Sequence, residues 1–90
     1  MTDQEKINWQ LVQDGNDAAF LVGHPAFDAI FRAVGQRYQD EWFSTTSSQK
    51  DRREMLWVKL QVLKDIKEML IAQVNIGRSV EESIQSNRFL

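Results

Sequence analysis

Ser48–Ile76 reads SQKDRREMLWVKLQVLKDIKEMLIAQVNI, and this stretch decides the fold. Its apolar residues recur at helical spacing from Met55 onward, and neither proline nor glycine interrupts them before Gly77. A helix of this length is a rod of about 40 Å, which is long for so small a chain. We therefore predict a long helix that Gly77 closes, with the other segments packed against it.

The predicted rod carries two adjoining apolar stripes. The leucine stripe consists of Leu56, Leu60, Leu63, Leu70 and Val74. The second stripe consists of Met55, Val58, Val62, Ile66, Met69 and Ile76. One buried helix face needs a stripe of roughly 100°, so two stripes offer a wider surface. Two short helices of the same chain could cover both stripes, or part of the second stripe could be left for another subunit. We favour self-association because the chain is so small.

The residues that we expect at an interface have large apolar side chains outside the leucine stripe. They are Met55, Trp57, Val58, Val62, Met69, Ile76, Phe89 and Leu90. Side chains of this kind dominate the binding energy of protein interfaces, and Trp9 is a further candidate on the same grounds. All of them could instead belong to the core. We assign Trp57 to an interface and Trp42 to the core.

The first half of the chain predicts a helix from about Asp3, because Thr2–Glu5 has the pattern of a capping box. If this helix continues to Val22, one of its faces carries Ile7, Leu11, Ala18 and Val22. The run Gln13–Asp17 contains poor helix formers, and its glycine alone costs about 1 kcal/mol relative to alanine. The helix either passes through this weak point or breaks into residues 3–13 and 16–22. We favour the continuous, weakened helix.

A second helix is predicted over Pro25–Phe43, because Gly23 suits the left-handed position that ends a helix and proline suits the first turn of the next. Its apolar stripe, expected to pack on the leucine stripe, consists of Phe27, Ile30, Phe31, Val34, Tyr38 and Trp42. The polar residues 44–48 are enough for the turn of a helical hairpin. A second capping box, Ser79–Glu82, predicts a short last helix to about Asn87.

The predicted fold is therefore all-α and forms a single domain over residues 1–90. It is an antiparallel helical hairpin with the N-terminal helix packed across it and a short C-terminal helix. The ordinary apolar and charged fractions, 42% and 27%, indicate a globular chain.

The net charge of −2 is unevenly distributed, with −4 on residues 1–48, +2 on residues 49–76 and zero on residues 77–90. This is not the basic surface expected of a nucleic-acid-binding protein. Acidic residues interrupt the basic residues of the rod, which are Lys50, Arg52, Arg53, Lys59, Lys64 and Lys67. We do not expect a nucleic-acid partner. The alternative function is a small regulatory or packaging protein that binds DNA as an oligomer, since oligomers could bring basic patches together.

The sequence gives no sign of an active site. Without cysteine there is no disulfide or thiolate metal site, and His24, the only histidine, is expected to cap a helix or lie in the turn. Adjacent carboxylates at Asp40-Glu41 and Glu81-Glu82 diverge on a helix and do not converge on one substrate. Nucleophile-elbow and phosphate-loop motifs are missing. We expect no enzyme, no catalytic or metal-binding residue, no cofactor and no small-molecule substrate.

The location that we expect is the cytoplasm of a bacterial host cell. The first ten residues are polar and acidic, unlike a signal peptide, and no apolar run approaches the roughly 20 residues of a membrane span. We therefore expect no membrane partner.

Residues from Asp14 to Val74 resemble small, mostly uncharacterised helical proteins encoded among the head and packaging genes of tailed bacteriophages. The shared features are the His24–Phe27 turn, the Tyr38–Trp42 pair and the polar turn before Arg53-Glu54-x-Leu56-Trp57. These are structural positions, and no functional residue is carried over. The resemblance implies a phage protein with a role in the particle or its assembly, a phage head or packaging protein as partner, and the virion as a second location.

Overall fold

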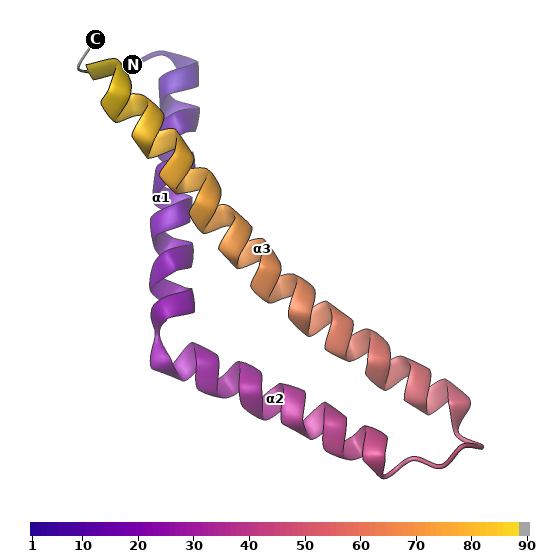
Figure 1. Cartoon of the computed structure of the whole chain (residues 1–90). Helices are drawn as coiled ribbons and strands as arrows, with labels where there is room; N and C mark the ends of the chain where they lie inside the picture. Colours follow the sequence, from indigo (N-terminus) through magenta and orange to yellow (C-terminus); the bar gives the residue numbers. More distant parts are fainter. Residues whose placement is uncertain (89–90) are drawn as a thin grey trace.

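The chain folds into three helices that share no compact centre. A computed structural model describes residues 1–88, which form α1 (Asp3–Gly23), α2 (Pro25–Phe43) and α3 (Lys50–Arg88) and contain no strand. In Figure 1, α2 and α3 meet at the turn over residues 44–49 and spread apart toward α1, and α1 crosses α3 near the two termini. The all-α prediction is confirmed.

The helix α1 begins and continues as its sequence predicts. The Thr2 hydroxyl accepts the Glu5 backbone N–H and donates to the Glu5 carboxylate, each at 3.1 Å, so Thr2 caps the helix as predicted, with Glu5 bound to its hydroxyl. The helix passes through Gly15 without a break. The side-chain amide of Gln10 donates to Asp14 at 2.8 Å across one turn of this weak segment.

The junction between α1 and α2 lies where the sequence predicts it but closes differently. Gly23 is the last residue of α1 and has no positive φ, so it does not adopt the left-handed conformation. Instead the His24 N–H donates to the Leu21 carbonyl at 3.2 Å, and His24 Nδ1 accepts the Ala26 N–H at 3.1 Å. His24 thus ends one helix and caps the next.

The helix α3 is longer than predicted. It runs unbroken through 39 residues, so the predicted end at Gly77 and the predicted short C-terminal helix are both wrong. Gly77 lies inside the helix and is buried under α1. Ser79–Glu82 does not start a new helix, because these residues lie inside α3. The Ser79 carbonyl accepts the Ser83 hydroxyl there at 3.1 Å.

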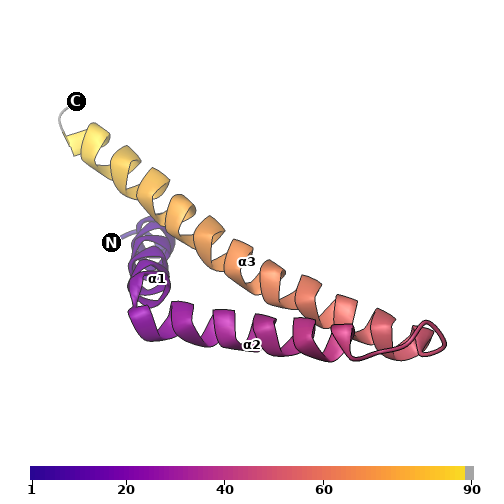
Figure 2. The same ribbon diagram turned by 60° about the horizontal axis from the view of Figure 1, so that its bottom comes forward.

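The two halves of α3 have different neighbours. Its C-terminal half packs closely against α1 and its N-terminal half lies beside α2, while α1 and α2 touch little (Figure 2). The N-terminal helix therefore packs mainly on α3 and not across both arms of a hairpin. The molecule is elongated, 64 × 25 × 18 Å, with a radius of gyration of 19.1 Å. A compact chain of this length has about 12 Å.

Few side chains are fully buried. Among the described residues the buried hydrophobic ones are Val12, Ala18, Leu56 and Val74. The rest of the leucine stripe, together with Trp42, is only half-buried. Ile30, predicted to pack on that stripe, is 61% exposed instead, because it lies at the edge of the α2 face that meets α3.

Candidate protein-interaction surface

The second stripe of α3 is exposed along its whole length. Its six residues keep spacings of three, four or seven, which places them along one side of the helix. Their exposed fractions range from 43% at Val58 to 72% at Met69. From Met55 to Met69 the stripe spans about 21 Å of helix. An exposed apolar row of this length is typical of a surface that another helix covers.

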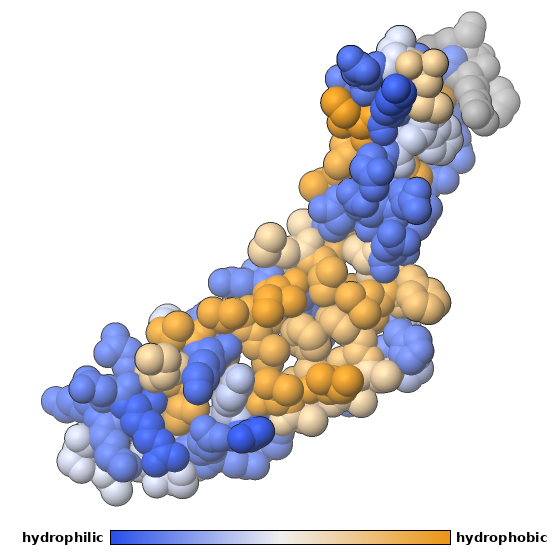
Figure 3. All heavy atoms as spheres, turned by 180° about the vertical axis from the view of Figure 1, so that it is seen from behind, coloured by the Kyte–Doolittle hydropathy of each residue, from blue (hydrophilic) through white to orange (hydrophobic). Residues whose placement is uncertain are grey.

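The second stripe is continuous with an apolar part of α2. Tyr38 of α2 and Val58, Val62, Leu63 and Ile66 of α3 line a shallow depression of about 220 Å³, together with Lys59. Figure 3, which views the molecule from behind, shows hydrophobic residues gathered over the middle of the α2–α3 pair. The Lys59 ammonium lies 5.6 Å from the centre of the Tyr38 ring and borders this surface.

Further along α3, a helix covers the side that adjoins the second stripe. Gly77 follows Leu70 by seven residues and Gln73 by four, so helical spacing places it between the leucine stripe and the second stripe. A Cβ built on Gly15 of α1 would lie 2.8 Å from the Gly77 Cα and 3.0 Å from the Gln73 carbonyl oxygen. In the C-terminal half of α3 this adjoining side therefore contacts α1, while the second stripe itself, Ile76 included, stays exposed among residues 1–88.

Trp57 lies on another side of α3 from the second stripe. It is 59% exposed and lines a depression of about 280 Å³ with Gln39, Trp42, Phe43 and Leu60. Phe43 is 77% exposed. The Arg53 guanidinium lies over the Trp42 ring, 4.1 Å from its centre, in a cation–π contact with one of the residues that line this aromatic depression. The predicted interface residues thus form two separate surfaces and not one.

Other predicted interface residues are distributed as follows. Phe89 and Leu90 lie outside the described residues. Trp9 is 41% exposed near the end of α3 and lines a depression with Ile84.

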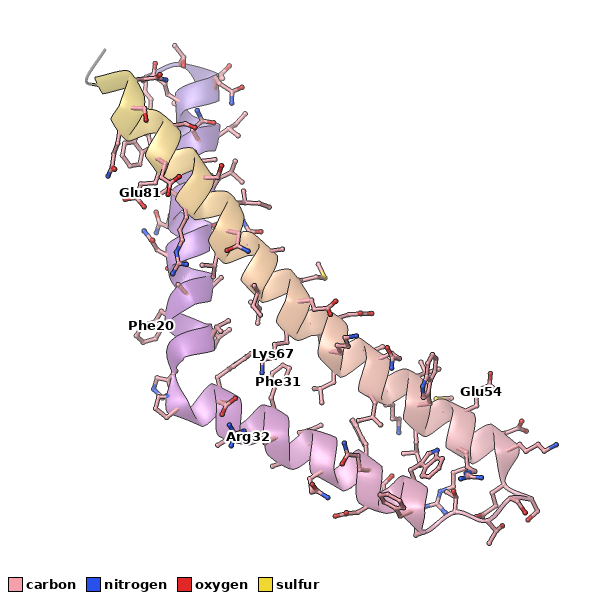
Figure 4. All side chains as sticks on the ribbon, viewed as in Figure 1. Phe20, Phe31, Arg32, Glu54, Lys67 and Glu81 are labelled. Carbon is pink, nitrogen blue, oxygen red and sulfur yellow. The ribbon has the colours of Figure 1, made fainter. Side chains whose placement is uncertain are left out.

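The sequence-based set of interface residues omitted several exposed ones. Ile66 belongs to the second stripe, and its helical spacing was enough to include it among the predicted interface residues. Phe20, which points away from α3 in Figure 4, is 74% exposed, and no pattern in the sequence marks it.

The basic side chains of α2 and α3 mostly face partners in the same molecule. Arg32 of α2 and Lys67 of α3 approach the carboxylate of Asp28, at 3.1 and 4.0 Å (Figure 4). Lys64 lies 3.8 Å from Glu68. These contacts are exposed and contribute little stability each. The basic side chains of α3 therefore lie at separate places and do not form one basic surface. This arrangement does not favour the DNA-binding alternative, which stays a prediction.

Residues 1–88 hold neither a group of three His, Asp or Glu side chains arranged for a metal ion nor a helix with the length and apolarity needed to cross a bilayer. Comparisons with protein-family models, with curated proteins and with solved structures find no match to this chain.

Proposed function

We propose that this chain is a non-enzymatic structural protein that acts by helix-mediated self-association and by binding a second protein. The observation that carries the proposal is the second stripe, an exposed apolar row on a helix whose other half is covered by α1. Burial of apolar area gives roughly 25 cal/mol per Å², so covering this row is a substantial driving force.

The setting that we propose is the particle of a tailed phage or its assembly, as the resemblance over Asp14–Val74 implies. In this setting the second stripe serves self-association. The aromatic depression beside Trp57 offers a separate place for a head or packaging component. Two exposed large aromatic side chains, Trp57 and Phe43, support this role because aromatic anchors are common at the centres of interfaces.

The test is the absolute mass in solution, by light scattering after size exclusion, across a wide range of protein concentration. The wild-type chain should exceed the 10.5 kDa of one copy. Val62→Glu should reduce the mass to that of a monomer with unchanged helix content by circular dichroism, because it places an unpaired charge in the covered row. A wild-type monomer at every concentration would rule out self-association.

Two control variants separate the surfaces. Gln61→Glu introduces the same charge one residue away, about 100° around α3, and should keep the wild-type mass. Trp57→Ser should also keep the mass but reduce the amount of protein that co-purifies with particles and assembly intermediates. If Val62→Glu unfolds the chain, the second stripe belongs to the core and the proposal fails.

A further inference from the structure

The chain exposes more surface than a compact monomer of its mass would. Its accessible surface is 7,082 Å². A compact monomer of this mass exposes about 5,400 Å², so the surplus is about 1,700 Å² per chain. A stable interface removes about 800 Å² from each partner. The surplus is therefore enough for one extensive interface between two copies.

We infer that the occupant of the second stripe is the same stripe of a second copy, with the two α3 helices antiparallel and Val62 near the two-fold axis. This inference rests on the proposed function and specifies its partner and geometry. Val62 is central between Met55 and Met69, so an antiparallel pair centred there covers the whole row between them in both copies. A two-fold interface of this kind uses one surface twice and closes at a dimer.

The distribution of charge favours the antiparallel arrangement. Residues 50–60 of α3 carry four basic and two acidic side chains, whereas α1 carries four acidic and one basic. Within one chain these segments are far apart, because α1 packs on the other half of α3. With Val62 at the axis, Lys50 of one copy lies opposite Val74 of the other.

Val74 lies beside α1, since Ala19 and Val22 of that helix line a depression with it. The basic end of each α3 thus comes near α1 of the partner copy, a helix whose four acidic and one basic side chains give it a net charge of −3. A parallel pair would instead place basic ends together and acidic helices together, which opposes association.

The test uses disulfide formation between single cysteines, which is clean because the chain has no cysteine of its own. Each variant is oxidised as the full-length protein, and the mass is read on a non-reducing gel. Val62→Cys should give a covalent dimer, doubling the mass from 10.5 kDa. Met55→Cys or Met69→Cys alone should stay single chains. A mixture of the two should form the crosslinked pair, because a disulfide needs Cα atoms about 4.4–6.8 Å apart.

Gln61→Cys, on another side of α3, controls for collisions and should give no covalent dimer. A covalent dimer from Met55→Cys alone would show a parallel pair and overturn the antiparallel arrangement. Failure of Val62→Cys to crosslink in a chain that light scattering finds associated would show that another surface pairs. Both results leave the proposed function standing. A monomeric mass at every concentration overturns the inference together with self-association itself.

Discussion

Gly15 and Gly77 face each other where α1 and α3 approach closely. A Cβ on Gly77 would lie 2.9 Å from the Gly15 Cα and 3.0 Å from the Leu11 carbonyl oxygen. Both obstacles are backbone atoms, which cannot move aside as a flexible side chain can. The glycines are therefore present for close approach of two helices and not for turns, since neither has a positive φ.

At this scale we predict that Gly77→Ala lowers the free energy of unfolding by about 1–3 kcal/mol, as overpacking does, despite the better helix propensity of alanine. Urea denaturation followed by circular dichroism measures the change. Gly23→Ala is the matched control: a Cβ there meets nothing within 4 Å, so stability should rise by up to about 1 kcal/mol. Equal gains from both variants would mean that the crossing is looser than described.

At the scale of the element, α3 is one helix with two environments. Its N-terminal half packs on α2 through the leucine stripe, and its C-terminal half packs on α1. Leu56 is 2% exposed, whereas Leu63 in the same stripe is only half-buried. The gap between α2 and α3 therefore closes most tightly near the turn.

We predict that Leu56→Ala costs about 2–5 kcal/mol of unfolding free energy, within the range for a buried leucine. Leu63→Ala should cost less, because its side chain already contacts solvent. Both substitutions are made in the Val62→Glu variant, which is expected to be a monomer. Paired urea titrations of the two double variants then measure the difference in unfolding free energy. A larger loss for Leu63→Ala would show that the second half of the α2–α3 contact is the stronger one.

At the scale of the whole molecule, the proposed self-association would add stability to an elongated chain with little core. The few buried hydrophobic side chains among residues 1–88 provide little core, and many large hydrophobic side chains, those of the second stripe among them, stay exposed. A partner that binds the folded chain stabilises it by mass action.

We therefore predict a melting temperature that rises with protein concentration. When the partner concentration is about a hundredfold above the dissociation constant, the gain is about 2.7 kcal/mol, which is about 10–20 °C for a domain of this size. Thermal unfolding by circular dichroism at several concentrations measures it. The Val62→Glu variant should melt at the same temperature at every protein concentration. The Gln61→Glu variant should show the same concentration dependence as the wild type. A concentration-independent wild type would mean that the chain folds without a partner.

The sequence by itself determined the helical class, the starts of α1 and α2 and the composition of both stripes. These features depend on local signals: the capping box at Thr2–Glu5, the proline at position 25 and apolar residues at helical spacing. Local signals act within one or two turns, so they can be recognised without knowing what lies opposite.

Only the tertiary structure decided the role of Gly77, the continuity of α3 and which parts of its apolar surface are covered. A glycine that ends a helix and a glycine that admits a neighbouring helix look the same in the sequence, because the difference is the presence of α1 against the backbone. Which stripe is covered likewise depends on where α1 and α2 lie along α3, since burial is a property of the facing surface and not of the residue alone.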